Sequence, residues 1–266
     1  MTLVICACVL NISTHIPTLK VRLEQFSSAI NAHTTHIILV YSEHDTSNTL
    51  ELLKEWQLTD QRLILLPDRV SHRSNYSSVN LGTARNVYMR YIEEHVSPTP
   101  QWMLVVDADD KLTEWQFDYE GLTKCIHQQT EWDALSVLSI PYWDWFAFRH
   151  PALNMVNCWE LERLGTPHTT TLSSSVKWAS SLHSTATQTP TFHAVLSAFS
   201  ACTLYKWDKV SGLRYDYNNE YSRRHVLPDC EHFHYHLQLV RERRARLVVS
   251  TAFTSRLMVE EKGSAS

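Results

Sequence analysis

An acidic cluster near the middle of the chain carries the residues best suited to chemistry. Asp107, Asp109 and Asp110 follow the uncharged residues 102–106 in the stretch WMLVVDADD. Carboxylates this close repel one another, and a turn or a helix cap needs at most one of them. Carboxylate oxygens on a short turn are typical ligands of Mg²⁺ or Mn²⁺, ions that keep open positions for diphosphate oxygens. The cluster therefore predicts a DxD metal–diphosphate site, and a solvated acidic turn is the alternative.

The elements expected around this cluster are those of an α/β sheet. Continuous apolar runs predict strands, and the amphipathic segments between them predict helices. The predicted strands of the first half are 3–10, 36–42, 62–68 and 102–106. In open α/β sheets, ligands bind outside the carboxyl ends of the strands. The acidic cluster, at the end of the fourth strand, therefore lies where a ligand would bind.

Composition and charge limit the possible functions. The 266 residues are 44% hydrophobic, which is enough for a well-buried core, and we expect one domain over 1–266. The formal net charge of -4, without a dominant basic run, argues against nucleic-acid binding. The cysteines contain no CxxC pair, so neither a zinc knuckle nor a dense disulfide framework is expected.

Two features favour a protein that acts in the cytoplasm. The apolar N-terminal run ends at Asn11, far short of a membrane span, and it lacks the basic residues that begin a signal peptide. Asn11 and Asn75 are N-glycosylation sequons, and a glycan on Asn11 would obstruct the ligand-binding edge of the sheet. We therefore expect a cytoplasmic protein without a membrane span.

An aromatic segment and a Ser/Thr-rich segment follow in the second half. Tyr142, Trp143 and further rings surround Asp144 in PYWDWFAFRHP. Such rings can stack on a sugar while the carboxylate accepts hydrogen bonds from hydroxyl groups. The alternative is an aromatic mini-core in which Asp144 pairs with Arg149. Segment 166–192 is rich in Ser and Thr and poor in hydrophobic residues, which predicts a flexible loop, either a lid or an insertion without function.

The stretch EHFHYH contains three histidines at alternating positions. On a strand, His232, His234 and His236 would share one face, as in some zinc hydrolases, whereas on a helix only His232 and His236 would. The following LQLVRERR is typical of a helix, and no HExxH motif is present. A zinc-dependent hydrolase is therefore an alternative function that rests on these histidines alone.

Five segments occur in the order seen in nucleotide-sugar transferases of the GT-A fold. They are ILVYSEHDTSNTLELL, LGTARN, VVDADD, YWDWFAFR and DCEHFHYHLQL, within about residues 37–240. The sequence most closely resembles the capsule-associated fungal α-1,3-mannosyltransferase-like family and its relatives in large algal viruses, the chloroviruses. This resemblance implies an α/β GT-A (Rossmann-like) fold: a mixed, mainly parallel sheet flanked by helices, with the DxD at the end of the fourth strand. It also implies a nucleotide-binding half at 1–110 and an acceptor-binding half at 111–266, which contains the flexible loop 166–192.

The resemblance also implies which residues bind the cofactor. Asp107 would face the ribose or the metal, Asp109 would ligate the metal directly, and His232 would complete the metal shell, with His234 in reserve. The expected cofactor is Mn²⁺ or Mg²⁺, bound together with a nucleotide-sugar donor.

The donor nucleotide is expected at the ends of the first two strands. Glu43 would lie by the base or the ribose. Arg85, expected in the first turn of a helix, would bind phosphate oxygens, for which a guanidinium is well shaped. Cys8, Asn11 and Ala108 are expected beside the nucleotide.

The function implied is a metal-dependent glycosyltransferase that moves a sugar, from a UDP-sugar by preference, to a hydroxyl of a glycan or glycoprotein. A viral capsid glycan modified in the host cytoplasm would be such an acceptor. Tyr142, Trp143, Asp144 and Arg149 are expected to form the sugar or acceptor wall.

An inverting reaction, which we favour, needs a carboxylate to take the acceptor proton. Glu231 is the first candidate by its place in the sequence, and Asp229 is the second. Besides the zinc hydrolase, a nucleotidyltransferase and a lectin-like module are alternatives. A nucleotidyltransferase normally has a Gly-rich, basic phosphate loop after the first strand, and NISTHIPTLK has none.

Overall fold

The computed structural model describes most of the chain. The described residues are 1–69, 74, 77–153, 155, 157–158, 161, 173–184, 189–215 and 228–258. The sequon Asn75 and two parts of the predicted loop, 166–172 and 185–188, lie outside them.

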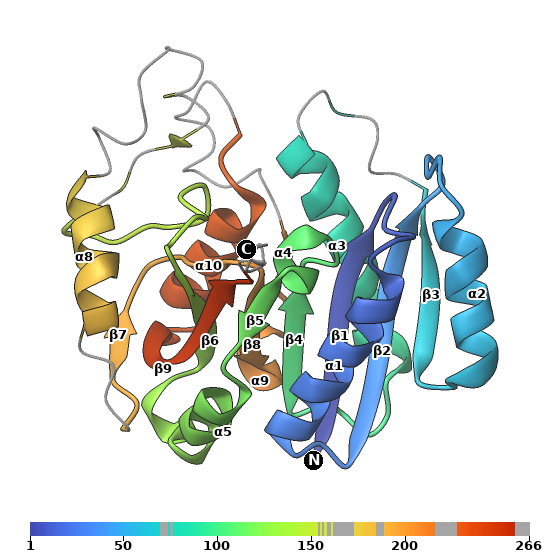
Figure 1. Ribbon diagram of the computed structural model, residues 1–266, viewed down its shortest axis with the longest axis horizontal. Coiled ribbons are helices and arrows are strands. Elements are labelled where there is room, and N and C mark those ends of the chain that lie inside the picture. Colours follow the sequence, from blue (N-terminus) through green and yellow to red (C-terminus); the bar gives the residue numbers. More distant parts are fainter. Residues whose placement is uncertain are drawn as a thin grey trace, which may run out of the picture.

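One mixed β-sheet runs through both halves of the chain (Figure 1). The described residues form nine strands in the spatial order β3-β2-β1-β4-β8-β6-β9-β5, with β7 paired to β9. The strands are β1 (Thr2–Val9), β2 (Thr34–Ser42), β3 (Leu63–Asp68), β4 (Trp102–Val106), β5 (Trp115–Phe117), β6 (Ala134–Ile140), β7 (Phe192–Ala194), β8 (Cys202–Lys206) and β9 (Leu247–Leu257). β3, β2, β1 and β4 are parallel, and β8 joins β4 in the antiparallel direction. The predicted strands of the first half are confirmed, and the acidic cluster follows the fourth of them.

Helices cover both faces of this sheet (Figure 1). They are α1 (Ile16–Ile30), α2 (Thr49–Thr59), α3 (Ser77–His95), α4 (Asp110–Thr113), α5 (Tyr119–His127), α8 (Ser173–Ser184), α9 (Trp207–Val210) and α10 (Glu231–Glu242), with a 3₁₀ turn η2 (Gln129–Glu131). α1 and α5 pack together over one face, and α3 and α10 pack together over the other. Within the described part of the chain, no helix has the length and apolar character that crossing a bilayer requires.

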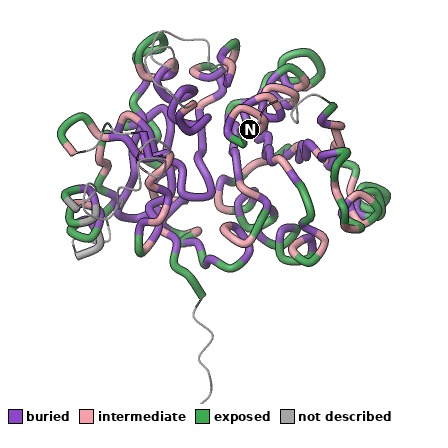
Figure 2. Tube along the Cα trace, turned by 90° about the horizontal axis from the view of Figure 1, so that it is seen from above, coloured by how far each residue is buried: buried purple, intermediate pink, exposed green. Residues whose placement is uncertain are grey.

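The parallel strands are apolar throughout because both of their faces are buried. In β1, Leu3, Ile5 and Ala7 belong to the core that contains the α1 side chains. Val4 and Cys6, from the alternate positions, belong to the core that contains the α3 side chains. Seen from above, buried residues run through the centre of the molecule and exposed residues surround them (Figure 2). Burial on both faces explains why the sequence shows continuous apolar runs instead of an alternation of apolar and polar residues.

The prediction of a flexible loop over 166–192 is wrong for the middle of this segment, which forms helix α8. Trp178, Ala179 and Leu182 recur at helical spacing and pack against the core that contains the α3 side chains. The surrounding serines make the segment polar on average, which hides the apolar face formed by Trp178, Ala179 and Leu182.

Helix α5 crosses β9 so closely at Gly121 that no side chain fits between them. A Cβ on Gly121 would lie 1.9 Å from the carbonyl oxygen of Ala252. We expect Gly121→Ala to lower the free energy of unfolding by about 1–3 kcal/mol, the usual cost of overpacking, as measured by urea titration. Glu120→Ala is the control, since that side chain is 80% exposed. Equal stability of Gly121→Ala and the wild type would show that α5 can move off β9 without cost.

Candidate functional site

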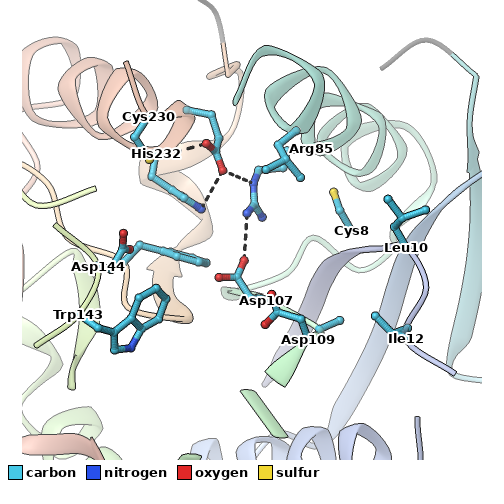
Figure 3. Close-up of a pocket in the computed structure, with 14 residues that line it drawn as sticks. Cys8, Leu10, Ile12, Arg85, Asp107, Asp109, Trp143, Asp144, Cys230 and His232 are labelled. Atoms are coloured by element: carbon cyan, nitrogen blue, oxygen red, sulfur yellow. Dashed lines mark hydrogen bonds and ion pairs between the residues drawn. The ribbon is translucent and has the colours of Figure 1, made fainter. Parts of the chain in front are cut away.

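A pocket of about 300 Å³ opens at the carboxyl edge of β1 and β4, where the sheet changes from parallel to antiparallel pairing (Figure 3). The predicted functional residues that line it are Cys8, Arg85, Asp107, Ala108, Asp109, Trp143, Asp144, Glu231 and His232. They come from β1, α3, the end of β4, the segment after β6 and the start of α10. The fold therefore gathers residues from both halves of the sequence into one site.

Arg85 joins two carboxylates across this pocket. Its Nη2 donates to Asp107 Oδ1 (3.3 Å) and its Nε donates to Glu231 Oε1 (3.4 Å), as the dashed lines in Figure 3 show. The side chain is 3% exposed, and the guanidinium lies 5.4 Å from the centroid of the Phe199 ring. Arg85 therefore ties the end of β4 to the start of α10.

The structure corrects the place expected for Arg85. Helix α3 begins at Ser77, which puts Arg85 well inside the helix instead of in its first turn. Its charge is already paired with two carboxylates, and leaving them for a phosphate would strand those charges in a buried site. The sequence hid this pairing because the partners are 22 and 146 residues away.

Carboxylates outnumber cations around the pocket. Asp107, Asp109, Asp144 and Glu231 line it, and Arg85 is the one Lys or Arg among its described lining residues. Burial raises the pKa of Asp107 well above its usual range, although the charge of Arg85 opposes the shift. Burial also raises the pKa of Asp144 to about 6, although two backbone N–H groups stabilise its charged form. The pocket is short of positive charge, which favours a cationic ligand.

Local hydrogen bonds hold the DxD turn in place. Asp109 Oδ1 accepts a hydrogen bond from Lys111 N (2.9 Å) and caps the short helix α4. Thr113 Oγ1 donates to the carbonyl of Asp109 (3.0 Å) and lies 2.8 Å from His15 Nδ1, beside the start of α1. The Asp107 side chain remains 25% exposed. The turn therefore presents Asp107 and Asp109 to the pocket from a well-held backbone.

His232 is the third residue predicted to bind a metal. Its ring stacks on Phe199 with the centroids 3.6 Å apart, and its Nε2 lies 3.7 Å from Glu231 Oε1. Neither ring nitrogen has a hydrogen-bond partner among the described residues. Burial lowers the pKa of His232 well below its usual value. A neutral imidazole with unused nitrogens has the chemistry of a metal ligand.

The predicted ligands are nevertheless not assembled as a finished metal site. Across the described ranges, no three His, Cys, Asp or Glu side chains lie close enough together to hold an ion. Asp107, Asp109 and His232 share the pocket and suit Mn²⁺ or Mg²⁺ by donor type, but they would have to move closer. Metal binding by these residues stays a prediction.

The zinc site considered for the three histidines is not supported. The stretch lies in helix α10, where residues two positions apart point to different faces. His234 therefore does not share a face with His232 and His236. His236 Nδ1 lies 2.9 Å from Ser197 Oγ, and its Nε2 lies 2.6 Å from the Tyr205 hydroxyl. Both ring nitrogens of His236 are therefore occupied, which leaves it none for zinc and makes it part of a buried hydrogen-bond network.

Three predicted site residues are buried outside the pocket lining. Tyr142 is 6% exposed, and its ring packs 4.8 Å from that of Trp145. Arg149 and Asp229 form a buried ion pair, with Nη2 2.5 Å from Oδ1. The structure therefore corrects the expectation that Tyr142 and Arg149 contact the acceptor and that Asp229 is the second candidate base. It also shows that Arg149 pairs with Asp229 instead of Asp144.

Asn11 and Glu43 lie on the surface and are not among the residues that line the pocket, although Leu10 and Ile12, beside Asn11, are. Asn11 Oδ1 accepts a hydrogen bond from Thr46 N (2.8 Å), which ties the end of β1 to the loop after β2. Glu43 lies 3.7 Å from Arg69, and 55% of its side chain is exposed. The side chains of both residues are therefore engaged in surface contacts and do not line the pocket.

A second cavity of about 370 Å³ adjoins the pocket at the ends of β1, β2 and β3. Cys8, Leu10 and Leu81 line both cavities, whereas Ser42 and Asp68 line only the second. Ser42 and Asp68 are the last residues of β2 and β3 and are paired in the sheet. Sequence reasoning missed them, although the strand-end position that singled out the acidic cluster applies to them as well.

Comparison with known proteins identifies the fold. No protein-family model and no curated protein matches the chain. Among solved structures, the chain is similar to a mannosyltransferase from Pyrobaculum calidifontis in complex with GDP-Man and Mn²⁺. The TM-score is 0.54 and the identity 12%, over 98% of this chain and 58% of the mannosyltransferase.

Weaker likenesses are to S. aureus TarS and to its residues 1–349 in complex with UDP. Their TM-scores are 0.48 and 0.47, at 13% and 12% identity, over 97% of this chain and 37% and 61% of theirs. The first likeness shows the GT-A fold of glycosyltransferases, with its mostly parallel sheet flanked by helices.

His236, on α10 but outside the pocket lining, makes the stability of the fold depend on pH. Burial lowers its pKa to about 3, whereas a histidine in an unfolded chain titrates near pH 6.5. As the pH falls, the unfolded chain takes up this proton first, so stability is lost from about pH 6.5 downward. Between pH 7.5 and 5.5, His236 should lower the free energy of unfolding by about 1.4 kcal/mol.

Urea titration at both pH values measures this effect in the wild type and in His236→Gln. The loss of stability between the two pH values should be smaller in the variant by about the stated amount, because Gln does not titrate. His127→Gln, at an exposed position, is the control and should leave the pH difference unchanged. An equal pH difference in His236→Gln and the wild type would contradict a neutral, buried His236.

Proposed function

We propose that this chain is a glycosyltransferase that moves a sugar from a nucleoside diphosphate to a hydroxyl of a glycan, with a divalent cation bound. One observation carries the proposal. Asp107 and Asp109, at the end of β4, share a pocket with Glu231, which Arg85 joins to Asp107. This arrangement offers one place for a cation and diphosphate and another for proton transfer. The GT-A fold supports the same conclusion.

Asp107, Asp109 and His232 would hold the cation. The mannosyltransferase that shares this fold was solved with Mn²⁺. When bound, such a cation offsets the negative charge that grows on the leaving diphosphate. The chain itself holds the two carboxylates in position, Asp107 through Arg85 and Asp109 through the cap of α4.

The donor nucleoside would occupy the second cavity, beside Cys8. Asp68 and Ser42 supply its polar wall in the role first assigned to Glu43. We favour uridine, because the Asp68 carboxylate can accept the ring N–H of uracil and the Ser42 hydroxyl can donate to a uracil carbonyl. GDP-Man in the mannosyltransferase makes guanine the competing base.

Trp143 and Asp144 would contact the transferred sugar or the acceptor. They line the side of the pocket away from Cys8 and Leu10 (Figure 3). The Trp143 ring offers an apolar face for a sugar, and Asp144 can accept hydrogen bonds from hydroxyl groups. The acceptor is a glycan, for which a viral capsid glycan made in the host cytoplasm is our specific proposal.

Glu231 would act as the base of an inverting reaction. The acceptor oxygen attacks the anomeric carbon, the bond from that carbon to the diphosphate oxygen breaks, and the acceptor proton passes to Glu231. Arg85 Nε donates a hydrogen bond to Glu231 Oε1 (3.4 Å), which orients this carboxylate in the pocket. Asp144 is the remaining candidate base, since Asp229 is buried against Arg149.

Calorimetric titration with UDP and GDP, with and without Mn²⁺, tests the proposal. We expect binding that requires Mn²⁺ and is tighter for UDP, and slow Mn²⁺-dependent hydrolysis of the matching nucleotide sugar. Asp109→Ala should abolish the Mn²⁺-dependent nucleotide binding and hydrolysis, because it deletes a predicted metal ligand from an exposed position. Asp110→Ala is the matched control, because Asp110 pairs with Lys111 and does not line the pocket. Full activity of Asp109→Ala, or no nucleotide binding by the wild type, would refute the proposal.

Glu231→Gln should separate chemistry from binding. The change keeps the size of the side chain but removes the proton acceptor, so turnover should fall by roughly 10²- to 10⁴-fold with donor affinity nearly unchanged. Steady-state kinetics and nucleotide titration measure the two effects. Glu242→Gln, at the exposed end of the same helix, is the control. Normal turnover of Glu231→Gln with an inverted product would move the role of base to Asp144.

A further inference from the structure

One wall of the pocket consists of three segments that are far apart in the sequence. They are 142–149, 196–201 and 229–234, and together we call them the three-segment wall. The first contributes Trp143 and Asp144, the second Phe199 and the third Glu231 and His232 to the pocket lining. These residues can act together only if the three segments keep fixed positions relative to one another.

Arg149 contacts all three segments at once. Its Nη1 donates to the carbonyls of Phe146 (3.0 Å) and Phe148 (2.7 Å), which organises the turn after Asp144. Its backbone N–H donates to the carbonyl of Ser197 (2.9 Å), and its carbonyl accepts from the N–H of that residue and of its neighbour. Its Nη2 donates to Asp229 Oδ1 (2.5 Å) at the edge of the third segment.

Asp229 also contacts the start of α10. Its Oδ1 also accepts a hydrogen bond from Cys230 N (2.8 Å), one residue before Glu231. The first residues of α10 receive no side-chain cap from the N-cap residue, Cys230, itself. The guanidinium of Arg149 lies 4.9 Å from the centroid of the Phe233 ring, on the first turn of the helix. Arg149 and Asp229 therefore fix the place from which Glu231 enters the pocket.

The pair is isolated from solvent and from the pocket. The Arg149 side chain is 0% exposed and that of Asp229 is 1% exposed, and neither residue lines the pocket. A fully buried ion pair usually contributes little net stability compared with apolar side chains of similar size, because both charges lose their hydration. Its specific directions can, however, fix one arrangement of the segments that it joins.

We infer that Arg149 and Asp229 are positioning residues, which hold Trp143, Asp144 and Glu231 in register without touching substrate. The catalytic part of this inference rests on the proposed function, whereas the structural part does not. Misplacing reacting groups by about 1 Å can reduce a rate by roughly 100-fold. The nucleotide-binding strands β1, β2 and β3 make none of the contacts described for the pair, so nucleotide affinity should depend on it little.

Arg149→Lys and Asp229→Asn test the inference with small changes. Lysine keeps the charge but has a single nitrogen in place of the two that reach Asp229 and the carbonyls, and asparagine keeps the shape but not the charge. Hydrogen–deuterium exchange should rise in 142–149 and 229–234, the segments that the two side chains join, and stay at the wild-type level in β1 to β3. Turnover should fall by about 10- to 100-fold, with the affinity for UDP or GDP in Mn²⁺ within about threefold of the wild type.

Arg62→Lys and Asp60→Asn are matched controls, because Arg62 and Asp60 form the same kind of pair (2.8 Å) at a more exposed position. They should leave both exchange and turnover unchanged. Wild-type exchange in both wall variants, or increased exchange spread evenly over the sheet, would overturn the inference. If the wild type transfers no sugar but exchange rises only in the three-segment wall, the proposed function fails and the positioning role stands.

Discussion

A buried guanidinium sets the main constraint on this molecule. Arg85 is 2% exposed, and a charge removed from water is costly unless opposite charges and hydrogen bonds replace the lost hydration. Its partners are Asp107, at the end of β4, and Glu231, at the start of α10. The charge is therefore paired with both carboxylates only when the C-terminal half folds back against the strand that carries the acidic cluster. The contact that meets this requirement also builds the pocket.

The sheet brings the two halves together through β8. This strand pairs antiparallel to β4, and in the turn before it the carbonyl of Ala201 accepts a hydrogen bond from Asp107 N (2.9 Å). Ser200 and Ala201 adopt φ angles of 49° and 79°, which residues other than glycine rarely do. Asp144 Oδ2 accepts from Ser200 N (3.0 Å) and holds this turn. This turn also places Phe199 against Arg85. The wall of the pocket and the position of the Arg85 guanidinium therefore depend on the same few contacts.

The parallel half of the fold and the position of the acidic cluster could be predicted because their signals are local. A continuous apolar run means a strand buried on both faces, and its last residues lie at the binding edge. Residues of the second half gave no such signal. Asp144 and Asp229 are both aspartates near an arginine and aromatic rings, yet one lines the pocket and the other pairs with Arg149, 80 residues earlier in the chain. Only the long-range packing decides between these roles.

The charge of the pocket constrains how a donor could bind. A diphosphate approaching Asp107, Asp109 and Glu231 would meet carboxylates, and the nearby Arg85 is already paired with two of them. Moving that guanidinium to the phosphates would leave buried carboxylates without a partner. Among the described residues no other Lys or Arg lines the pocket, which is why the proposed donor complex includes a divalent cation. The proposal of a cation therefore rests on the paired state of Arg85 as well as on the DxD pattern.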